Sequence, residues 1–206
     1  MSKGKWAILT VALVIVADQI LKIWIKTSMT LGGEISVFGD WFTLHFVENN
    51  GMAFGLELEG STGKLLLTSF RIIAVGGIGY YLYKQIKNNA PLGLVISLAL
   101  VVAGAFGNIV DSAFYGMIFS DSVYGQTTPA VMFPEGGGYA PFLFGKVVDM
   151  FHFRLFHGVY PDWVPILGGD DFMFFRPVFN IADSAITCGV ASLILFQKKF
   201  FYVKKN

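Results

Sequence analysis

The chain has little charge and almost no cysteine. Only 14% of its 206 residues are Asp, Glu, Lys or Arg, whereas about a quarter of a soluble domain is charged. The single cysteine, Cys188, excludes an internal disulfide framework and a cysteine-based metal site. The net charge of +1, without a long Lys/Arg run, excludes a nucleic-acid-binding surface. What the chain has instead is 54% hydrophobic residues, including 21 Phe, so we expect membrane lipids to cover much of its surface.

Four stretches are long and apolar enough to cross a bilayer, whose hydrocarbon core needs about 20 helical residues. They are about 6–26, 65–84, 92–111 and 177–197. The first stretch is not expected to be a signal peptide, because Asp18 and Lys22 interrupt it and no small-x-small cleavage site follows. Pro177 suits the first turn of the fourth helix, where its missing N–H is not needed.

The distribution of basic residues predicts the orientation of these spans. One side of the membrane collects many of them: Lys3, Lys5, Lys84, Lys87, Lys198, Lys199, Lys204 and Lys205. The longer segments on the other side carry only Lys64, Lys146, Arg154 and Arg176. By the positive-inside rule, both termini are cytoplasmic, and the loops 27–64 and 112–176 face outward.

The outer loops contain two segments that mix aromatic and polar residues as β structure does, at 38–46 and 146–153. Between them, 119–144 is rich in Gly, Pro and aromatic residues, which suits an ordered loop at the membrane interface. The predicted fold class is therefore an all-α membrane protein with four transmembrane helices, a small extracytoplasmic β element and an inserted outer loop. The whole chain, 1–206, is expected to form one integral membrane domain.

Ionisable residues inside spans are costly and are functional candidates by default. Asp18, Asp111 and Asp183 all fall toward the predicted outer ends of their spans, so we expect them to converge at outer-leaflet depth. Asp18 and Lys22 form an i, i+4 pair with the acid first, which favours a structural role for Asp18. Asp183 has no basic partner in its own helix and is the more reactive candidate.

Helical spacing predicts one polar stripe on each of the last two spans. The stripes consist of Gly104, Asn108 and Asp111 on the third span and Asn180, Asp183 and Thr187 on the fourth. On the third span, Gly104 allows another helix to approach closely. We expect Asn108 and Asp111 to build a hydrogen-bond network.

Arg71 and the histidines lie outside these stripes. Arg71 near the outer end of the second span either snorkels to the outer headgroups or contacts a lipid phosphate. His45, His152 and His157 show no metal-ligand spacing. No metal and no cofactor is therefore expected.

Five motifs, in this order along the chain, resemble those of the lipoprotein signal peptidase family. They are DQILK at 18–22, NNGMAFG at 49–55, GAFGNIVD at 104–111, KVVDMF at 146–151 and FNIADSAI at 179–186. The corresponding family patterns are D-Q-x-x-K, N-x-G-A-A-F, G-x-x-G-N-x-x-D-R, V-V-D-F and F-N-x-A-D-x-x-I. One such match alone would be weak evidence of the family. The five together cover all of the chain except the inserted outer loop.

The resemblance implies an intramembrane aspartic endopeptidase (signal peptidase II type) of the bacterial inner membrane, acting as a monomer. Its substrate would be a prolipoprotein, cut on the amino side of a diacylglyceryl-modified cysteine by water activated between two carboxylates. Asp149 and Asp183 are the implied catalytic pair. The resemblance also implies inhibition by the cyclic peptide globomycin.

Supporting roles are implied for residues from four of the motifs. Asn49 and Gly51 would bind the substrate backbone, and the other supporting residues are Asp18, Lys22, Asn108, Asp111 and Asn180. In such a pair one proton is shared, because two close carboxylates in a low-dielectric site cannot both ionise. Which Asp is base and which is acid is left open.

The chain departs from the family pattern at Ser112, where the family has Arg. A charge partner for Asp111 or for the substrate is then missing or comes from elsewhere, with Lys146 and Arg154 as candidates. Met52 replaces a small Ala.

Two other classes of membrane protein place carboxylates between helices. A proton-coupled transporter more often has inverted repeats and carboxylates near the midplane, and a scaffolding protein uses polar stripes for helix association. Neither class explains an acidic residue in an outer loop matched to one in a helix.

Overall fold

The computed structural model describes residues 1–49, 60–166, 168–174 and 177–201. Its helices are α1 (Lys3–Ser28), α2 (Gly60–Lys87), α3 (Leu92–Val110), the π-helical turn η1 (Asp111–Tyr115), α4 (Gly116–Ile118), α5 (Ile181–Leu195) and α6 (Gln197–Phe201). Its strands are β1 (Glu34–Phe38), β2 (Phe42–Asn49), β3 (Val147–Phe153), β4 (Phe156–Val159), β5 (Asp171–Phe174) and β6 (Val178–Phe179).

The described residues contain three helices long and apolar enough to cross a membrane, together with the shorter apolar helix α5. The three are Lys3–Ser28, Thr62–Lys87 and Leu92–Ile118, each a few residues longer than the sequence predicts. Large apolar side chains on α1 and α2 point away from the protein, among them Ile8, Ile20 and Ile73. A surface of this kind is stable only against an apolar solvent, which agrees with the low charge of the chain.

The fourth helix begins later than predicted. Residues Val178–Phe179 form β6, which pairs with β3 through Phe151↔Phe179 and His152↔Val178. The helix starts only after Asn180, whose side chain accepts a hydrogen bond from the backbone N–H of Asp183. Asn180 is thus the N-cap and not part of a helical stripe, and Asp183 lies in the first turn. A capping box of this kind is a strong local start signal, whereas Pro177 permits either a strand or a helix start.

The third helix does not end at Asp111 as predicted. The chain continues through η1 into α4, so the helical path reaches Ile118. Asp111 begins the π-helical turn and is fully buried, and the carbonyl of Ser112 accepts a hydrogen bond from Gly145 N–H just before β3. The wide turn therefore brings the end of the inserted segment 119–144 back against the helix.

The β structure is more extensive than an all-α class allows. β1, β2, β3 and β6 form one antiparallel sheet in that order, and β4 and β5 form a separate hairpin. The predicted segment 38–46 spans the turn between β1 and β2, whereas the predicted 146–153 matches β3. Side chains alternate between faces along a strand. Aromatic rings therefore gather on the face of β2 and β3 that carries Phe42, Phe151 and Phe153, with Phe42 and Phe153 stacked 4.5 Å apart.

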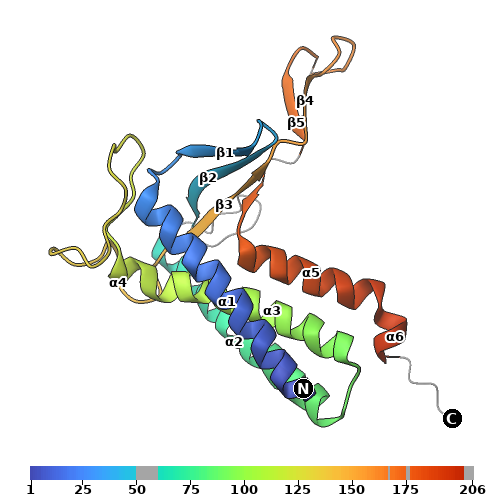
Figure 1. Ribbon diagram of the computed structural model, residues 1–206. Coiled ribbons are helices and arrows are strands. Elements are labelled where there is room, and N and C mark those ends of the chain that lie inside the picture. The colour runs from blue at the N-terminus through green and yellow to red at the C-terminus, as the bar shows by residue number, and fades with distance from the viewer. Residues whose placement is uncertain (50–59, 167, 175–176, 202–206) are drawn as a thin grey trace.

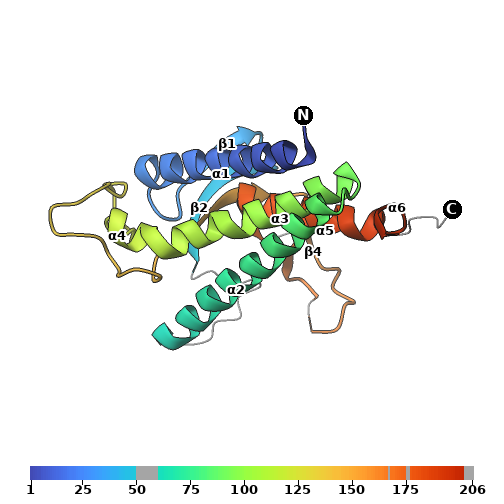
Figure 2. The same cartoon turned by 90° about the horizontal axis from the view of Figure 1, so that it is seen from below.

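The sheet lies against the helices, and the β4–β5 hairpin projects away from it (Figure 1). Both views show that the start of α1 and helix α6 lie at one end of the molecule, and the loops that follow α4 lie at the other (Figures 1 and 2). One apolar core joins α1, α2, α3 and α6 around Leu94, Val95 and Leu98. A second core joins the far end of α1 to the sheet through Ile25, Phe46 and Met150.

Helices α3 and α5 pack closely because Gly104 has no side chain. A Cβ at Gly104 would meet the carbonyl oxygen of Ala182 at 2.1 Å and the Ile186 side chain at 2.8 Å. This contact holds the first turn of α5, and with it Asp183, against α3.

We therefore expect Gly104→Ala to force α5 away from α3. An overpacked core costs about 1–3 kcal/mol, which for a chain of this size corresponds to a fall in Tm of about 5 °C. Gly76→Ala on α2 is the matched control, because nothing lies within 4 Å of a Cβ there. Thermal unfolding of the two variants in detergent tests this, and equal Tm values would contradict the close-packing account.

Candidate active site

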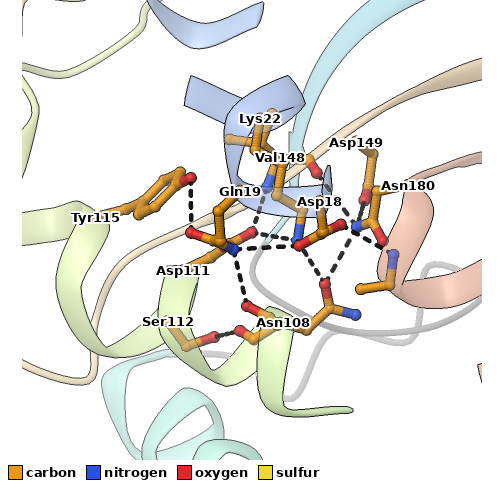
Figure 3. A network of polar contacts seen from close by, with 12 residues as sticks. Asp18, Gln19, Lys22, Asn108, Asp111, Ser112, Tyr115, Val148, Asp149 and Asn180 are labelled. Atoms are coloured by element: carbon orange, nitrogen blue, oxygen red, sulfur yellow. Dashed lines mark hydrogen bonds and ion pairs between the residues drawn. The ribbon is translucent and has the colours of Figure 1, made fainter. Parts of the chain in front are cut away.

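A buried lysine stands at the centre of the polar site. Lys22 on α1 is 0% exposed, and its Nζ lies 2.9 Å from Asp18 Oδ2 and 2.8 Å from Asp111 Oδ2. It also donates a hydrogen bond to Asn108 Oδ1 at 2.8 Å (Figure 3). A buried ammonium needs such partners, since burying an unpaired charge is strongly unfavourable. The i, i+4 pairing of Asp18 with Lys22 predicted from spacing is therefore confirmed, and Asp111 joins it.

The two carboxylates beside Lys22 also hold backbone from other elements. Asp18 Oδ1 accepts the N–H of Ala182 in the first turn of α5 at 2.9 Å. Asp111 Oδ2 accepts the N–H of Val148 in β3 at 3.3 Å. A carboxylate at a helix N-terminus is also favoured by the helix dipole. Asp18 and Asp111 thus fix the start of α5 and the start of β3 relative to α1 and α3.

Gln19 completes this part of the network. Its Nε2 donates to Asp111 Oδ1 at 2.8 Å, and its Oε1 accepts the hydroxyl of Tyr115 at 3.1 Å (Figure 3). The resemblance includes Gln19 in its first motif, but neither Gln19 nor Tyr115 was predicted as a site residue. The signal for Tyr115 was weak, because it lies beyond the expected end of the third helix.

Asn180 links the two predicted catalytic residues. Its Nδ2 donates to Asp149 Oδ1 at 2.6 Å, and its Oδ1 accepts the backbone N–H of Asp183 at 2.8 Å. In return, Asp183 Oδ2 accepts the backbone N–H of Asn180 at 3.3 Å. The side chain of Asn180 is fully buried and is also within hydrogen-bond distance of Val148 O and Asn108 Oδ1, both at 3.2 Å. One amide therefore ties β3 to the first turn of α5.

Each of the two predicted catalytic carboxylates accepts a further amide N–H. Asn49 at the end of β2 donates to Asp149 Oδ2. Asn108 on α3 donates from Nδ2 to Asp183 Oδ1 at 2.8 Å. Because Lys22 binds the oxygen of Asn108, the NH₂ group of that side chain must face Asp183. The structure brings together every predicted site residue that it describes, while Gly51 lies outside the described residues.

The electrostatic setting of Asp149 favours its protonated form. Asp149 is only 3% exposed. Burial, followed by the nearby negative charge of Asp183, raises the pKa of Asp149 to about 8, against the smaller opposing effects of Lys22 and the hydrogen bond from Asn180. At neutral pH this carboxyl therefore carries a proton and can donate a hydrogen bond.

The expected charge partners of Asp111 were wrong. Lys146 contacts Asp121 at 2.8 Å and Glu48 at 3.5 Å, and Arg154 contacts Glu34 at 2.5 Å. The partner of Asp111 is Lys22. Ser112, which stands where the family pattern has Arg, donates its hydroxyl to the Asn108 carbonyl at 3.1 Å.

Two further charged features were not predicted. Buried Lys26 on α1 contacts Glu48 and donates to Ser122 at 2.9 Å, so that it joins α1 to β2 and to the inserted segment. Arg71 on α2 lies within electrostatic range of Asp183 and Asp149. The negative charges of Asp183 and Asp149 act on its guanidinium, an interaction that neither expected role of Arg71 had included.

A buried carboxylate, Asp149, and a partly buried one, Asp183, both bound by amides, can share one proton and divide the work of an acid and a base. Comparison with known proteins agrees with this chemistry. The sequence profile of the family described as "Signal peptidase (SPase) II" matches residues 10–199. The chain belongs to the signal peptidase II family. It is therefore a bacterial membrane enzyme and an aspartic peptidase, as its motifs predict.

Individual members of the family span most of the chain. The lipoprotein signal peptidase of Porphyromonas gingivalis is 50% identical over 194 residues, which cover 94% of this chain and 83% of that protein. The lipoprotein signal peptidase of Amoebophilus asiaticus is 39% identical over 202 residues, which cover 96% of this chain and 80% of that protein. A bacterial membrane enzyme solved by the in meso method at 2.3 Å resolution has a TM-score of 0.59 and 25% identity, covering 98% of this chain and 94% of its own.

The buried lysine generates a prediction about stability. Lys22→Met leaves Asp18 and Asp111 buried without a cation, and breaking a buried ion pair in this way costs about 3–5 kcal/mol. We expect Tm in detergent to fall by about 10 °C.

Lys5→Met is the control, because Lys5 is an exposed lysine on the same helix, and its Tm should match the wild type. Adding Asp111→Asn to Lys22→Met should recover part of the loss. A Lys22→Met protein as stable as the wild type would show that the ion pairs do not hold the site.

Proposed function

We propose that this protein removes the signal peptide from diacylglyceryl-modified prolipoproteins, cutting on the amino side of the lipidated cysteine, with Asp149 and Asp183 as the catalytic pair. One observation carries the assignment. The Asn180 side chain donates to Asp149 at 2.6 Å and accepts the backbone N–H of Asp183 at 2.8 Å. The two acids therefore share one polar site, although they lie on different elements.

The hydrogen-bond donors around the pair support a water-mediated reaction. Asp149 holds the shared proton, because burial and the charge of Asp183 disfavour its ionised form. Asp183 then acts as the general base that removes a proton from water, and the water oxygen attacks the scissile carbonyl. Asp149 donates its proton toward the carbonyl oxygen as the tetrahedral intermediate forms. When the intermediate collapses, the C–N bond breaks, Asp183 gives the proton it took from water to the departing amine, and Asp149 regains its proton from a hydroxyl of the intermediate. The amides of Asn108, Asn180 and Asn49 keep both carboxylates oriented through the cycle.

The substrate would reach this site from the outer leaflet. We assign the helices Lys3–Ser28, Thr62–Lys87 and Leu92–Ile118 as three crossings. The 15 residues of α5 extend about 22 Å, so the fourth crossing needs α6 as well. Both termini would then lie in the cytoplasm, which agrees with the positions of the start of α1 and of α6 at one end of the molecule (Figures 1 and 2).

With this topology, the lipid chains of the substrate stay in the bilayer while its peptide reaches the carboxylates near the outer face. Asn49 at the end of β2 and Gly51 beyond it would bind the substrate backbone. We expect residues 1–206 to work as one domain and as a monomer, and globomycin to block processing.

The assignment of the pair predicts the effect of two isosteric changes. Asp149→Asn or Asp183→Asn removes the shared proton or the base, and each should lower the rate of processing by about 10²–10⁴-fold, as loss of a general acid or base does. The measurement is cleavage of a diacylglyceryl prolipoprotein by the purified enzyme in lipid. The control is Asp40→Asn, at an exposed acid in the turn between β1 and β2, which should leave the rate unchanged. Near wild-type processing by either active-site variant would overturn the assignment.

The raised pKa of Asp149 predicts a pH dependence. The carboxyl is protonated below about pH 8 and ionised above it. Activity that needs this proton should therefore fall about tenfold per pH unit on the alkaline side of pH 8. Asn49→Ala removes an N–H that favours the ionised form, so it should move the alkaline limb to higher pH. The pH profile of kcat/KM tests both statements, and a profile flat well beyond pH 8 would contradict them.

A further inference from the structure

A second cluster of ligand-type side chains lies on the outer sheet, apart from the proposed catalytic pair. Glu34 is directly opposite His45 on the paired strands β1 and β2, and His152 on β3 is opposite Thr43, two residues before His45. Since side chains two residues apart share one face of a strand, all three ligand-type residues lie on the same face. Asp149 lies three residues before His152 in β3 and therefore on the opposite face.

The donor atoms of this cluster converge on one point. Glu34 Oε1 lies 3.2 Å from His45 Nδ1 and 4.0 Å from His152 Nδ1. All the ligand atoms are within 4.8 Å of one another. The two rings lie 5.5 Å apart, centroid to centroid. Ligands in a tetrahedral zinc site, at about 2.0–2.2 Å from the ion, are separated by similar distances after small side-chain rotations.

The Nδ1 atoms of His45 and His152 also lack a hydrogen bond to the protein residues that the structure describes. Both atoms are buried. Burying a polar nitrogen without a partner is costly. The carboxylate of Glu34 is a third exposed, at 33%, so an ion and its water can reach the cluster.

Arg154 would compete with a metal ion for the carboxylate of Glu34. Its Nη2 lies 2.5 Å and 2.7 Å from the two oxygens of Glu34. An ion pair between these two residues explains the position of the carboxylate. It does not explain why two imidazole nitrogens point at the same carboxylate oxygen without hydrogen bonds. A metal ion satisfies all three donors, and Arg154 can keep its contact with the second oxygen.

We propose that Glu34, His45 and His152 bind one divalent transition-metal ion, with zinc as the best fit. Two neutral imidazoles and one carboxylate are a donor set typical of zinc with a fourth position for water. The ion would cross-link β1, β2 and β3, and so stiffen the strand that carries Asp149. The spacing of the histidines along the chain had argued against a metal, but here the ligands come together through strand register. The site is independent of the proposed peptidase reaction.

Zinc binding to the purified protein in detergent, measured by competition with a chromophoric chelator, tests this site. We expect one ion per chain and an increase in Tm as zinc is added, because a ligand that binds only the folded state stabilises it. Glu34→Gln, His45→Gln and His152→Gln should each weaken binding by about tenfold or more. His157→Gln is the control: it removes a histidine of the separate hairpin strand β4 and should leave binding unchanged.

A second measurement does not depend on how the variants fold. Cobalt(II) added to the wild-type protein should give the visible absorption bands of a tetrahedral site with nitrogen and oxygen ligands, and zinc should abolish these bands. Binding that is unaffected by all three substitutions, or weakened equally by His157→Gln, would overturn the proposal. Absence of stoichiometric zinc binding and of tetrahedral cobalt bands in the wild type would overturn it as well.

Discussion

The buried ammonium of Lys22 determines how the other polar groups of the site are arranged. It faces two carboxylates and an amide oxygen, each within 2.9 Å. Because Asn108 gives its oxygen to Lys22, its N–H groups are available for Asp183. Because Asp18 and Asp111 meet at the same cation, the first turn of α5 and the start of β3 are brought to the same place. A buried positive charge thus fixes the geometry of the residues that we propose carry out the reaction.

The four acids of the site differ in their partners, and the difference suggests a division of roles. Asp18 and Asp111 each contact the Lys22 ammonium, so their negative charge is balanced in place. The side-chain donors that the structure describes around Asp149 and Asp183 are amides from Asn49, Asn108 and Asn180. A neutral amide orients a carboxylate without balancing its charge. This contrast supports our proposal that the second pair is the one whose protonation changes during the reaction.

Much of this arrangement could be predicted from the sequence. Long apolar stretches predicted the three long helices within a few residues, and an i, i+4 spacing predicted the Asp18–Lys22 pair. The family motifs identified each member of the site that the structure describes, apart from Gln19, Tyr115, Arg71 and the Lys26–Glu48 pair. Local patterns suffice for these features because they arise within one helix or one short motif.

Other features depend on long-range contacts that no local pattern encodes. The predicted start of the fourth helix was wrong because β6 pairs with β3. Only that pairing decides whether the residues after Pro177 form a strand or a helix. The predicted charge partners of Asp111 were wrong because its cation, Lys22, comes from α1 and not from the outer loops. The cluster of Glu34, His45 and His152 exists only through the register of three strands.

The central claim is that Asp149 and Asp183 hold a single proton between them, and that Asp149 carries it at rest. Infrared difference spectroscopy of the carboxyl C=O stretch at neutral pH measures this directly. The wild-type protein should show a protonated-carboxyl band that is absent from Asp149→Asn and that disappears above about pH 8. An identical band in the wild type and in Asp149→Asn, or no loss of this band as the pH rises, would contradict the account.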